Sequence, residues 1–183
     1  MKEILIVSHC ILNNAAKVAQ DESGLAEEYA QRNSLMQTVA DKGVQLIQLP
    51  CPEYILYGAK RWGHVKDQFD NPLFRAQCRA MLEPVMMQLE EYAHHPERFR
   101  LLGVVSVEGS PSCGYALTCR GSWGGEFDEG TCENGGPSSS VRMTNEPGVF
   151  MEVLEKMLGE HRLDIRILSI SEAAVLIAEK QSQ

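Results

Sequence analysis

The segment LLGVVSVEGSPSCG, residues 101–114, places a run of apolar, largely β-branched side chains directly before a turn rich in Gly, Ser and Pro. Such a run is typical of a strand buried in a sheet, and the Gly and Pro that follow it cannot continue the strand. Cys113 therefore lies just beyond a strand end, in a turn that presents its sulfur to whatever occupies the edge of the sheet.

Two earlier segments repeat this arrangement of an apolar run followed by a cysteine. The run KEILIVSHC at 2–10 ends in Cys10, and the run VQLIQLPCPE at 44–53 is terminated by prolines on either side of Cys51. Apolar runs of this length are typical of strands that are buried on both faces of a parallel sheet. The sequence therefore predicts three strands, each with a cysteine at its carboxyl end.

Segments with helical periodicity separate these strands. We expect helices over 25–42, 72–89, 147–158 and 172–180, and a last short strand over 164–168. Strands that are joined through helices run parallel, so the sequence predicts a single domain, 1–183. Its expected fold is a three-layer α/β architecture of the Rossmann or flavodoxin type, with a mostly parallel sheet and helices on both faces. Cys78 lies on the apolar face of the second helix, where we expect a core residue.

Three local features complete the expected fold. The segment 54–71 mixes aromatic, glycine and charged residues without a clear period and is expected to be a loop over the sheet. The segment 114–145 is long and rich in Gly and Ser, which is typical of a functional loop or a lid. Ser171 is the expected N-cap of the last helix.

Charge and hydropathy restrict the classes of function. The chain has 17 Lys and Arg against 25 Asp and Glu, a formal charge of −8, which argues against general binding to nucleic acid or to an acidic membrane. The apolar run near the N-terminus is too short for a signal peptide, and no run is long enough to cross a bilayer. We expect a cytoplasmic protein, in which the six cysteines do not form three structural disulfides and the conspicuous ones serve metal binding or catalysis.

The three cysteines at strand ends form the candidate site. In a parallel sheet the carboxyl ends of the strands share one edge, where ligands bind. Cys10, Cys51 and Cys113 are therefore expected to meet there and to hold a soft metal, such as zinc or copper, or an iron–sulfur cluster. Three thiolates leave one coordination position open, as in catalytic sites. His9 could complete a zinc site, although it is expected to be a packing or supporting residue.

Three short motifs resemble those of a known family. SHCILN at 8–13, PCPE at 50–53 and GSPSCG at 109–114 occur in the order and at the separations of the cysteine motifs of the DUF523 family, typified by thiouracil desulfidase. The resemblance covers most of the chain and implies an α/β fold. It also implies a [4Fe-4S] cluster held by the three cysteines, whose fourth iron takes the sulfur of a thiolated substrate. His9, Asn13 and the segment after PCPE depart from the family pattern, so the chain resembles a desulfidase-related branch rather than thiouracil desulfidase itself.

This chemistry suggests roles for three further residues. Replacing C=S by C=O requires a base that activates water, and Glu53, two residues after Cys51, is the candidate; a capping role in the proline turn is the alternative. Ser110 and Ser112 could donate hydrogen bonds to a cluster sulfide or to the substrate, or could close the turn. The expected partner is a small thiolated heterocycle bound by a monomer or homodimer.

Other residues near the motifs have less specific roles. Five residues in the segment after PCPE could line a site for a planar ligand, because aromatic rings and guanidinium groups stack on such ligands. The alternative is that they belong to a plain surface loop. These residues are Tyr54, Tyr57, Arg61, Trp62 and His64. Ser8 is a weaker candidate for the hydrogen-bonding role. Cys119 and Cys132 are expected to be spare thiols or supporting residues, with a redox pair as a minor hypothesis.

Two other classes of function stay open on the sequence. The first is a metal-free thiol hydrolase with Cys113 as nucleophile and His9 or His64 as base, in which Cys10 and Cys51 are dispensable. The second is a non-catalytic protein with a structural zinc or an electron-transfer cluster. That class requires a fourth protein ligand, and the sequence offers no fourth cysteine in a comparable strand-end turn.

Overall fold

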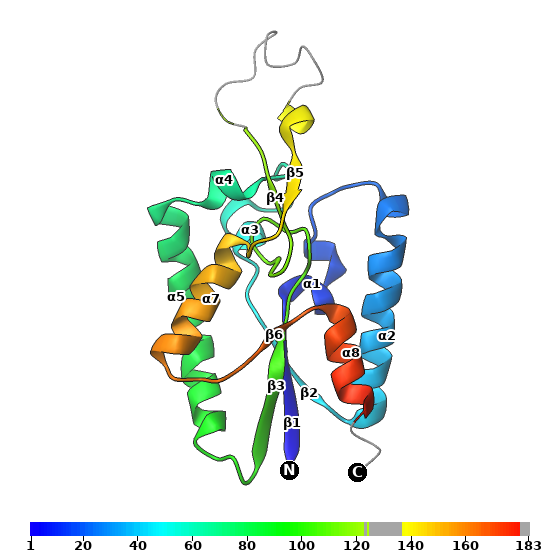
Figure 1. Cartoon of the computed structure of the whole chain (residues 1–183), viewed down its shortest axis with the longest axis vertical. Helices are drawn as coiled ribbons and strands as arrows, with labels where there is room; N and C mark the ends of the chain where they lie inside the picture. Colours follow the sequence, from blue (N-terminus) through cyan, green and yellow to red (C-terminus); the bar gives the residue numbers. More distant parts are fainter. Residues whose placement is uncertain (123, 125–136, 180–183) are drawn as a thin grey trace.

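The fold is a parallel sheet between two pairs of helices, seen in a computed structural model that describes residues 1–122, 124 and 137–179 (Figure 1). The strand order is β2-β1-β3-β6, and all three neighbouring pairs are parallel. These strands are β1 (Lys2–Val7), β2 (Gln45–Gln48), β3 (Phe99–Val105) and β6 (Ile167–Leu168). The predicted α/β fold of the Rossmann or flavodoxin type is confirmed.

Two pairs of long helices cover the two faces of the sheet. On one face α2 (Ala26–Lys42) packs against α8 (Ile170–Ala178), and on the other α5 (Pro72–Ala93) packs against α7 (Val149–Glu160) (Figure 1). The buried side chains of α5 recur every three or four residues, the period of a helix with one face in the core. Cys78 belongs to this face and is fully buried, as predicted.

Short elements gather at the carboxyl edge of the sheet. The chain leaves β1 into α1 (His9–Leu12) and the 3-10 turn η1 (Asn14–Ala16), and a second 3-10 turn, η2 (Glu22–Leu25), precedes α2. It leaves β2 into α3 (Pro52–Tyr57) and α4 (Lys66–Phe69). After β3 a small antiparallel pair forms from β4 (Thr118–Arg120) and β5 (Arg142–Thr144), with η4 (Pro137–Ser140) just before β5.

The expectation of a loop over 54–71 is wrong in part, because α3 and α4 lie there. Pro52 occupies the first turn of α3, where its missing N–H costs nothing, and the Cys51 sulfur accepts from the amide of Tyr54. Gly58 ends the helix with a φ of 73°, a conformation that favours glycine. Pro52 and Gly58 do mark the two ends of α3 in the sequence. The helix has only six residues, too few to show a helical period.

The expected cap of the last helix is also wrong. Ser169, rather than Ser171, is the N-cap of α8, and its side chain accepts from the amide of Glu172. The Glu172 carboxylate accepts in return from the amide of Ser169, which completes a capping box. The spacing of Ser and Glu three residues apart decides the start of the helix.

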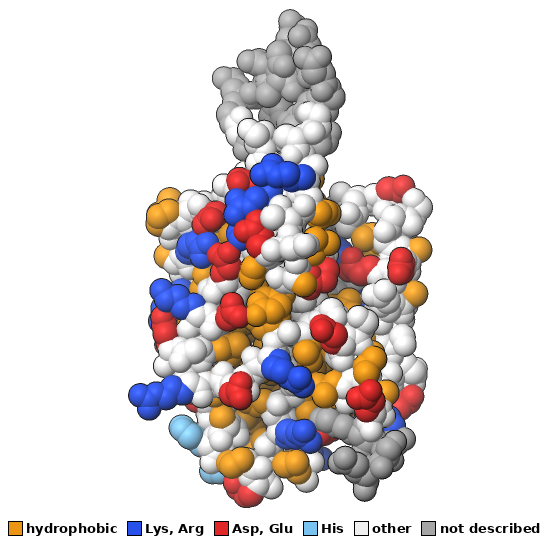
Figure 2. All heavy atoms as spheres, in the orientation of Figure 1, with side chains coloured by type: hydrophobic (Ala, Val, Ile, Leu, Met, Phe, Trp, Pro, Cys, Tyr) orange, Lys and Arg blue, Asp and Glu red, His pale blue; other side chains and the backbone are white. Residues whose placement is uncertain are grey.

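A network of ion pairs joins the β4–β5 pair to the helices below it. Lys66 is 1% exposed and lies 2.8 Å from a Glu146 oxygen and 2.5 Å from a Glu152 oxygen on α7. Arg120 on β4 pairs with Glu146 at 2.5 Å and with Asp67 on α4 at 2.8 Å. Blue and red side chains gather over β4 and β5 in Figure 2. The network fixes β4 against α4 and α7.

Among the residues that the structure describes, none of the helices combines the length and the apolar character needed to span a membrane.

Candidate functional site

The site lies at the carboxyl ends of β1 and β3, the two central strands. The chain continues from β1 toward one edge of the sheet and from β3 toward the other. From β1 the chain passes to the edge strand β2, whereas β3 lies on the other side of β1, so a crevice opens at the carboxyl edge of the sheet. Cys10, Cys51 and Cys113 follow β1, β2 and β3, and all three line one cavity of about 340 Å³. The structure therefore brings together three cysteines that are far apart in the sequence.

The turn that carries Cys113 is closed by its own hydrogen bonds. The Ser110 hydroxyl oxygen accepts from the amide of Cys113 at 3.0 Å and lies 3.4 Å from the amide of Ser112. The amide of Val107 donates to the Cys113 carbonyl at 2.9 Å, and the amide of Gly114 donates to the Ser110 carbonyl at 3.1 Å. Ser110 thus closes the turn, the second of its two predicted roles.

The first turn of α7 holds the outer side of the same turn. The amides of Gly148 and Val149 donate to the carbonyls of Gly114 and Pro111, and the amide of Phe150 donates to the Ser112 carbonyl. Such amides have no partner inside their own helix, so the cysteine turn satisfies them. A Cβ on Gly148 would lie 2.6 Å from the Ser112 carbonyl oxygen, so this close approach requires glycine.

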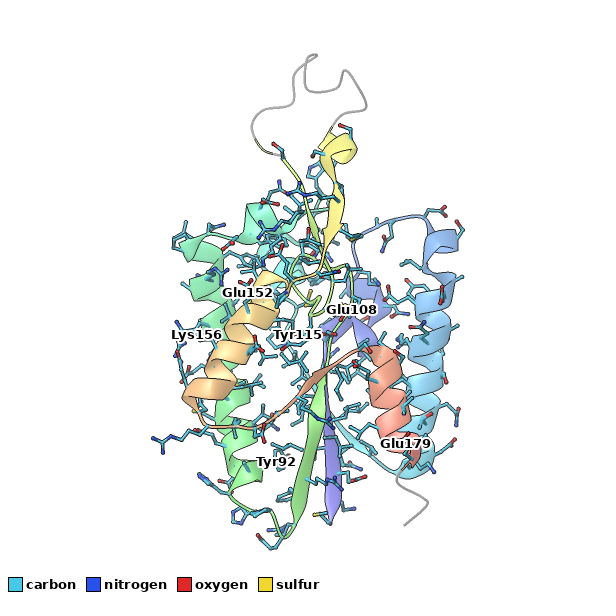
Figure 3. All side chains as sticks on the ribbon, in the orientation of Figure 1. Tyr92, Glu108, Tyr115, Glu152, Lys156 and Glu179 are labelled. Atoms are coloured by element: carbon cyan, nitrogen blue, oxygen red, sulfur yellow. The ribbon has the colours of Figure 1, made fainter. Side chains whose placement is uncertain are left out.

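Glu108 braces the base of the turn. Its carboxylate accepts from the Ser106 hydroxyl at 2.6 Å, from the amide of Leu117 at 2.7 Å and from the amide of Tyr115 at 3.4 Å. Glu108 and Tyr115 lie close together beyond the carboxyl end of β3 in Figure 3. The sequence analysis did not single out Glu108, although an acidic residue between a buried strand and a Gly-Ser-Pro turn was an available signal.

Glu53 joins the second cysteine segment to the third. It lies in the first turn of α3, and one carboxylate oxygen accepts from the Ser112 hydroxyl at 2.5 Å. The other oxygen accepts from Arg61 Nε at 3.3 Å. A hydroxyl has one proton to donate, so Ser112 gives it to Glu53, while the Cys113 sulfur lies 3.4 Å from the same hydroxyl oxygen. The carboxylate therefore faces the cavity in a fixed orientation.

Burial keeps the three thiols protonated in the metal-free protein. Desolvation, together with the nearby Cys51, raises the pKa of Cys10 to about 12. Desolvation, and then the nearby Cys10, raises the pKa of Cys113 well above its usual value. Desolvation also raises the pKa of Cys51, whose sulfur accepts from a backbone amide. The cavity therefore disfavours three bare thiolates, and a cation bound among them would reverse that preference.

A lysine beside Cys10 was missed by the sequence analysis. Lys17 lines the cavity, and its ammonium group lowers the pKa of Cys10 against the larger effect of desolvation. Its Nζ pairs with Glu28 on α2, which also lines the cavity. No local motif marks either residue, because their proximity depends on how α2 packs over the segment that follows α1.

A curated protein shares much of this sequence. The uncharacterized protein MJ0003 of Methanocaldococcus jannaschii is 36% identical to the chain over 112 residues, which cover 61% of the chain and 67% of that protein. The chain belongs to the MJ0003 family. No family model matches the chain, and no solved structure matches it. Because MJ0003 is itself uncharacterized, the function of this branch has to be argued from the site.

Only part of the predicted stacking wall lies at the cavity of this MJ0003 family member. Arg61 and His64 line it, whereas Tyr54, Tyr57 and Trp62 are exposed and are not among its lining residues. The His64 ring packs against the rings of Tyr57 and Phe69, with centroids 4.9 and 4.8 Å away. Desolvation lowers the pKa of His64, so its imidazole is neutral at neutral pH. For the three exposed residues the structure agrees with the alternative, a surface position away from the cavity.

The remaining candidates have mainly structural surroundings. The Ser8 hydroxyl donates to the Val105 carbonyl at 2.8 Å and ties β1 to β3. His9 is not among the residues that line the cavity. Cys119 on β4 does line it, and its thiol lies 3.5 Å from the His64 carbonyl oxygen. Cys132 lies outside the described residues.

The side chains at the cavity determine which kind of metal group could bind there. Within the described part of the chain, no three His, Cys, Asp or Glu side chains form a group that could hold a single metal ion. Cys10, Cys51 and Cys113 line one cavity, together with Ser110 and Ser112. Thiolates are the ligands that iron–sulfur clusters use. The residues present therefore fit a cluster of several atoms, which would occupy the cavity, better than a single metal ion.

Proposed function

We propose that this protein is an iron–sulfur-dependent desulfidase, which replaces the C=S group of a small thiolated heterocycle by C=O. The observation that carries the proposal is the cavity lined by Cys10, Cys51 and Cys113, with Glu53 and Ser112 in contact beside them. The resemblance of the three motifs to those of the DUF523 family supports the same assignment. Cys10, Cys51 and Cys113 would hold a [4Fe-4S] cluster.

The reaction balances without a change of oxidation state. A thiocarbonyl and one water give a carbonyl and hydrogen sulfide, so no external electron donor or acceptor is needed. When bound, the cluster would supply a Lewis-acidic iron without a protein thiolate, as the acceptor for the departing sulfur. The protein supplies the base and the enclosed cavity.

Glu53 is the group that takes a proton from the attacking water. Glu53 lines the cavity and its side chain is 12% exposed, so it can reach a water there while bulk solvent is largely excluded. The Ser112 hydroxyl at 2.5 Å and Arg61 Nε at 3.3 Å hold the two oxygens. The Ser112 hydroxyl also lies next to the Cys113 sulfur, so it orients the base beside the reacting group.

The walls of the cavity suit a small ligand of mixed polarity. Val107, Val141 and Met143 supply apolar surface, and Lys17 supplies a hydrogen-bond donor. These are features of sites that bind small molecules. We propose a thiouracil-like heterocycle as the ligand and the cytoplasm as the compartment, where a thiolate-bound cluster is protected from oxidation.

The metal-free hydrolase has less support from the site. Among the described residues no hydrogen bond joins the imidazole of His9 or His64 to Cys113, and burial raises the pKa of that thiol. A nucleophilic cysteine needs a lowered pKa or an adjacent base. A purely structural metal site does not account for Glu53 and Ser112 at the cavity.

The decisive experiment is anaerobic purification with iron and sulfide analysis. We expect a brown protein with about four irons per chain, which releases sulfide from 2-thiouracil or 4-thiouracil. Single Ser replacements of Cys10, Cys51 and Cys113 each remove the colour and the turnover. Absorption, metal analysis and chromatography of the carbonyl product check these outcomes.

Cys78→Ser is the matched control, because Cys78 is also a buried free cysteine but lies on the core-facing side of α5, away from the cavity. It keeps the cluster, at a moderate cost in stability. Protein that binds no iron after anaerobic reconstitution, or that keeps its turnover when Cys10 or Cys51 is replaced, contradicts the proposal and favours the thiol hydrolase.

A further inference from the structure

Arg61 lies at the junction of the three cysteine segments. Its side chain is 3% exposed, although it comes from an irregular segment between α3 and α4. Nε donates to a Glu53 oxygen at 3.3 Å, one terminal nitrogen donates to the Gly58 carbonyl at 3.2 Å, and the other donates to the Ala16 carbonyl at 2.6 Å. The three acceptors belong to different parts of the site.

Each acceptor connects Arg61 to one cysteine. Ala16 ends the 3-10 turn that follows the helix of Cys10. Gly58 ends α3, whose N-cap is Cys51. Glu53 accepts from Ser112, the residue before Cys113. A single guanidinium group therefore bonds directly to two of the three segments and reaches the third through one carboxylate.

The surroundings of Arg61 fix the guanidinium group itself. Its central carbon lies 5.9 Å from the centroid of the Tyr54 ring, a contact of the cation–π type. A planar guanidinium with several donors in fixed directions suits such a junction, whereas an ammonium group makes bonds in no fixed plane. The Glu53 carboxylate has one oxygen on Arg61 and one on Ser112, so it cannot rotate without losing a hydrogen bond.

We propose that Arg61 is the positioning residue of the candidate site, which aims the Glu53 carboxylate and holds the segments after Cys10 and Cys51 together. This inference rests on the proposed desulfidase function for its effect on turnover. Arg61 makes its contacts within the protein and does not itself exchange protons with the substrate. Misplacing a catalytic group by about 1 Å can cost about 100-fold in rate.

The first test compares Arg61→Gln and Arg61→Lys with the wild type after cluster reconstitution. We expect Arg61→Gln to keep its iron and sulfide and to lose about 100-fold in kcat per cluster, with KM within about twofold. Arg61→Lys recovers part of the loss. In Arg61→Ala, added guanidinium ion restores turnover, an effect that a merely structural role would not produce.

Arg32→Gln is the matched control. Arg32 also bonds to two backbone carbonyls, those of Ile11 and Leu12, but is not among the residues that line the cavity. This variant keeps wild-type kcat. If Arg61→Gln keeps wild-type kcat per cluster, or if its only defect is a lower cluster content that guanidinium does not correct, the positioning role is overturned while the desulfidase function stands.

A second test needs no cluster. In metal-free reduced protein an aromatic disulfide reagent modifies exposed thiols, and mass spectrometry locates the site. We expect Cys51 to react about tenfold faster in Arg61→Gln than in the wild type, because the tie between α3 and Ala16 is lost, and to react at the wild-type rate in Arg32→Gln. If the wild type neither holds iron nor releases sulfide, the proposed function fails, and the positioning role is then judged from the modification rate of Cys51 alone. Equal Cys51 rates in Arg61→Gln and in the wild type overturn the positioning role.

Discussion

Ser110 and Ser112 lie two residues apart in the cysteine turn and have different partners. The Ser110 oxygen accepts from the backbone of its own turn, whereas the Ser112 hydroxyl donates to Glu53 on another element. A hydroxyl that closes a turn contributes to the position of Cys113, and a hydroxyl on a buried carboxylate contributes to the orientation of the proposed base, Glu53. Replacing each serine separates the two contributions.

If the proposed function holds, we expect Ser112→Ala to keep the cluster and to lose most of the desulfidase turnover. The Glu53 oxygen loses a partner at 2.5 Å inside the protein, which also costs about 1–3 kcal/mol of folding stability. Ser110→Ala instead opens the turn, so its cluster content falls together with its turnover. Iron analysis and kcat per cluster, measured on both variants, check the difference. Equal cluster loss in both would contradict separate roles.

At the scale of elements, α7 determines where Cys113 lies. Its first-turn amides donate to the carbonyls of the turn, and Gly148 permits the backbones to approach closely. Four orphan amides at a helix start are normally satisfied by a capping side chain or by water. Here another loop satisfies them, so the helix and the cysteine turn form one rigid unit.

Gly148→Ala is expected to break this unit. The added Cβ would lie 2.6 Å from the Ser112 carbonyl oxygen, a distance that forces backbone to move and costs about 1–3 kcal/mol. Thermal unfolding and cluster content both report the change. Gly159→Ala, at the other end of the same helix, meets nothing within 4 Å and leaves stability unchanged or slightly higher. Similar melting temperatures for the two variants would show that the close approach is unimportant.

The pattern of the sequence predicts helices and strands better than it predicts the side-chain contacts of the site. Apolar runs and helical periods predicted the four strands of the parallel sheet and the four long helices, and strand-end cysteines predicted a shared edge, because these features depend on local period and on the parallel topology. The expectation of a loop or lid over 114–145 missed the short strands β4 and β5. The contact between Glu53 and Ser112 joins residues 59 positions apart, and its formation depends on how α3 packs against the turn. The Lys17–Glu28 pair depends on helix packing in the same way.

Across the whole molecule, the ion-pair network links stability to pH. Hydrogen bonds from Arg120, and then from Lys66, lower the pKa of Glu146 from 4.5 to about 2. Because the folded pKa lies below the unfolded one, this stabilisation is complete above pH 4.5 and is lost as the pH falls toward about 2. The network therefore weakens in acid, although the core is unchanged.

We expect the unfolding free energy of the wild type to fall between pH 5 and pH 2 by about 1–2 kcal/mol more than that of Glu146→Gln. Urea unfolding at a series of pH values measures both curves. The difference between them is constant above pH 5, where Glu146 is ionised in both the folded and the unfolded chain. Parallel curves over the whole range would mean that Glu146 contributes nothing to acid sensitivity.

The dependence of the Cys113 turn on α7 has a consequence for the order of synthesis. The chain is made from its N-terminus, so Cys10 and Cys51 leave the ribosome long before Cys113, and α7 follows later still. The turn lacks the amides that hold it until residues 148–151 have been made. Any group that needs all three thiols can be loaded only after most of the chain has been translated, and until then the cell must keep these thiols reduced.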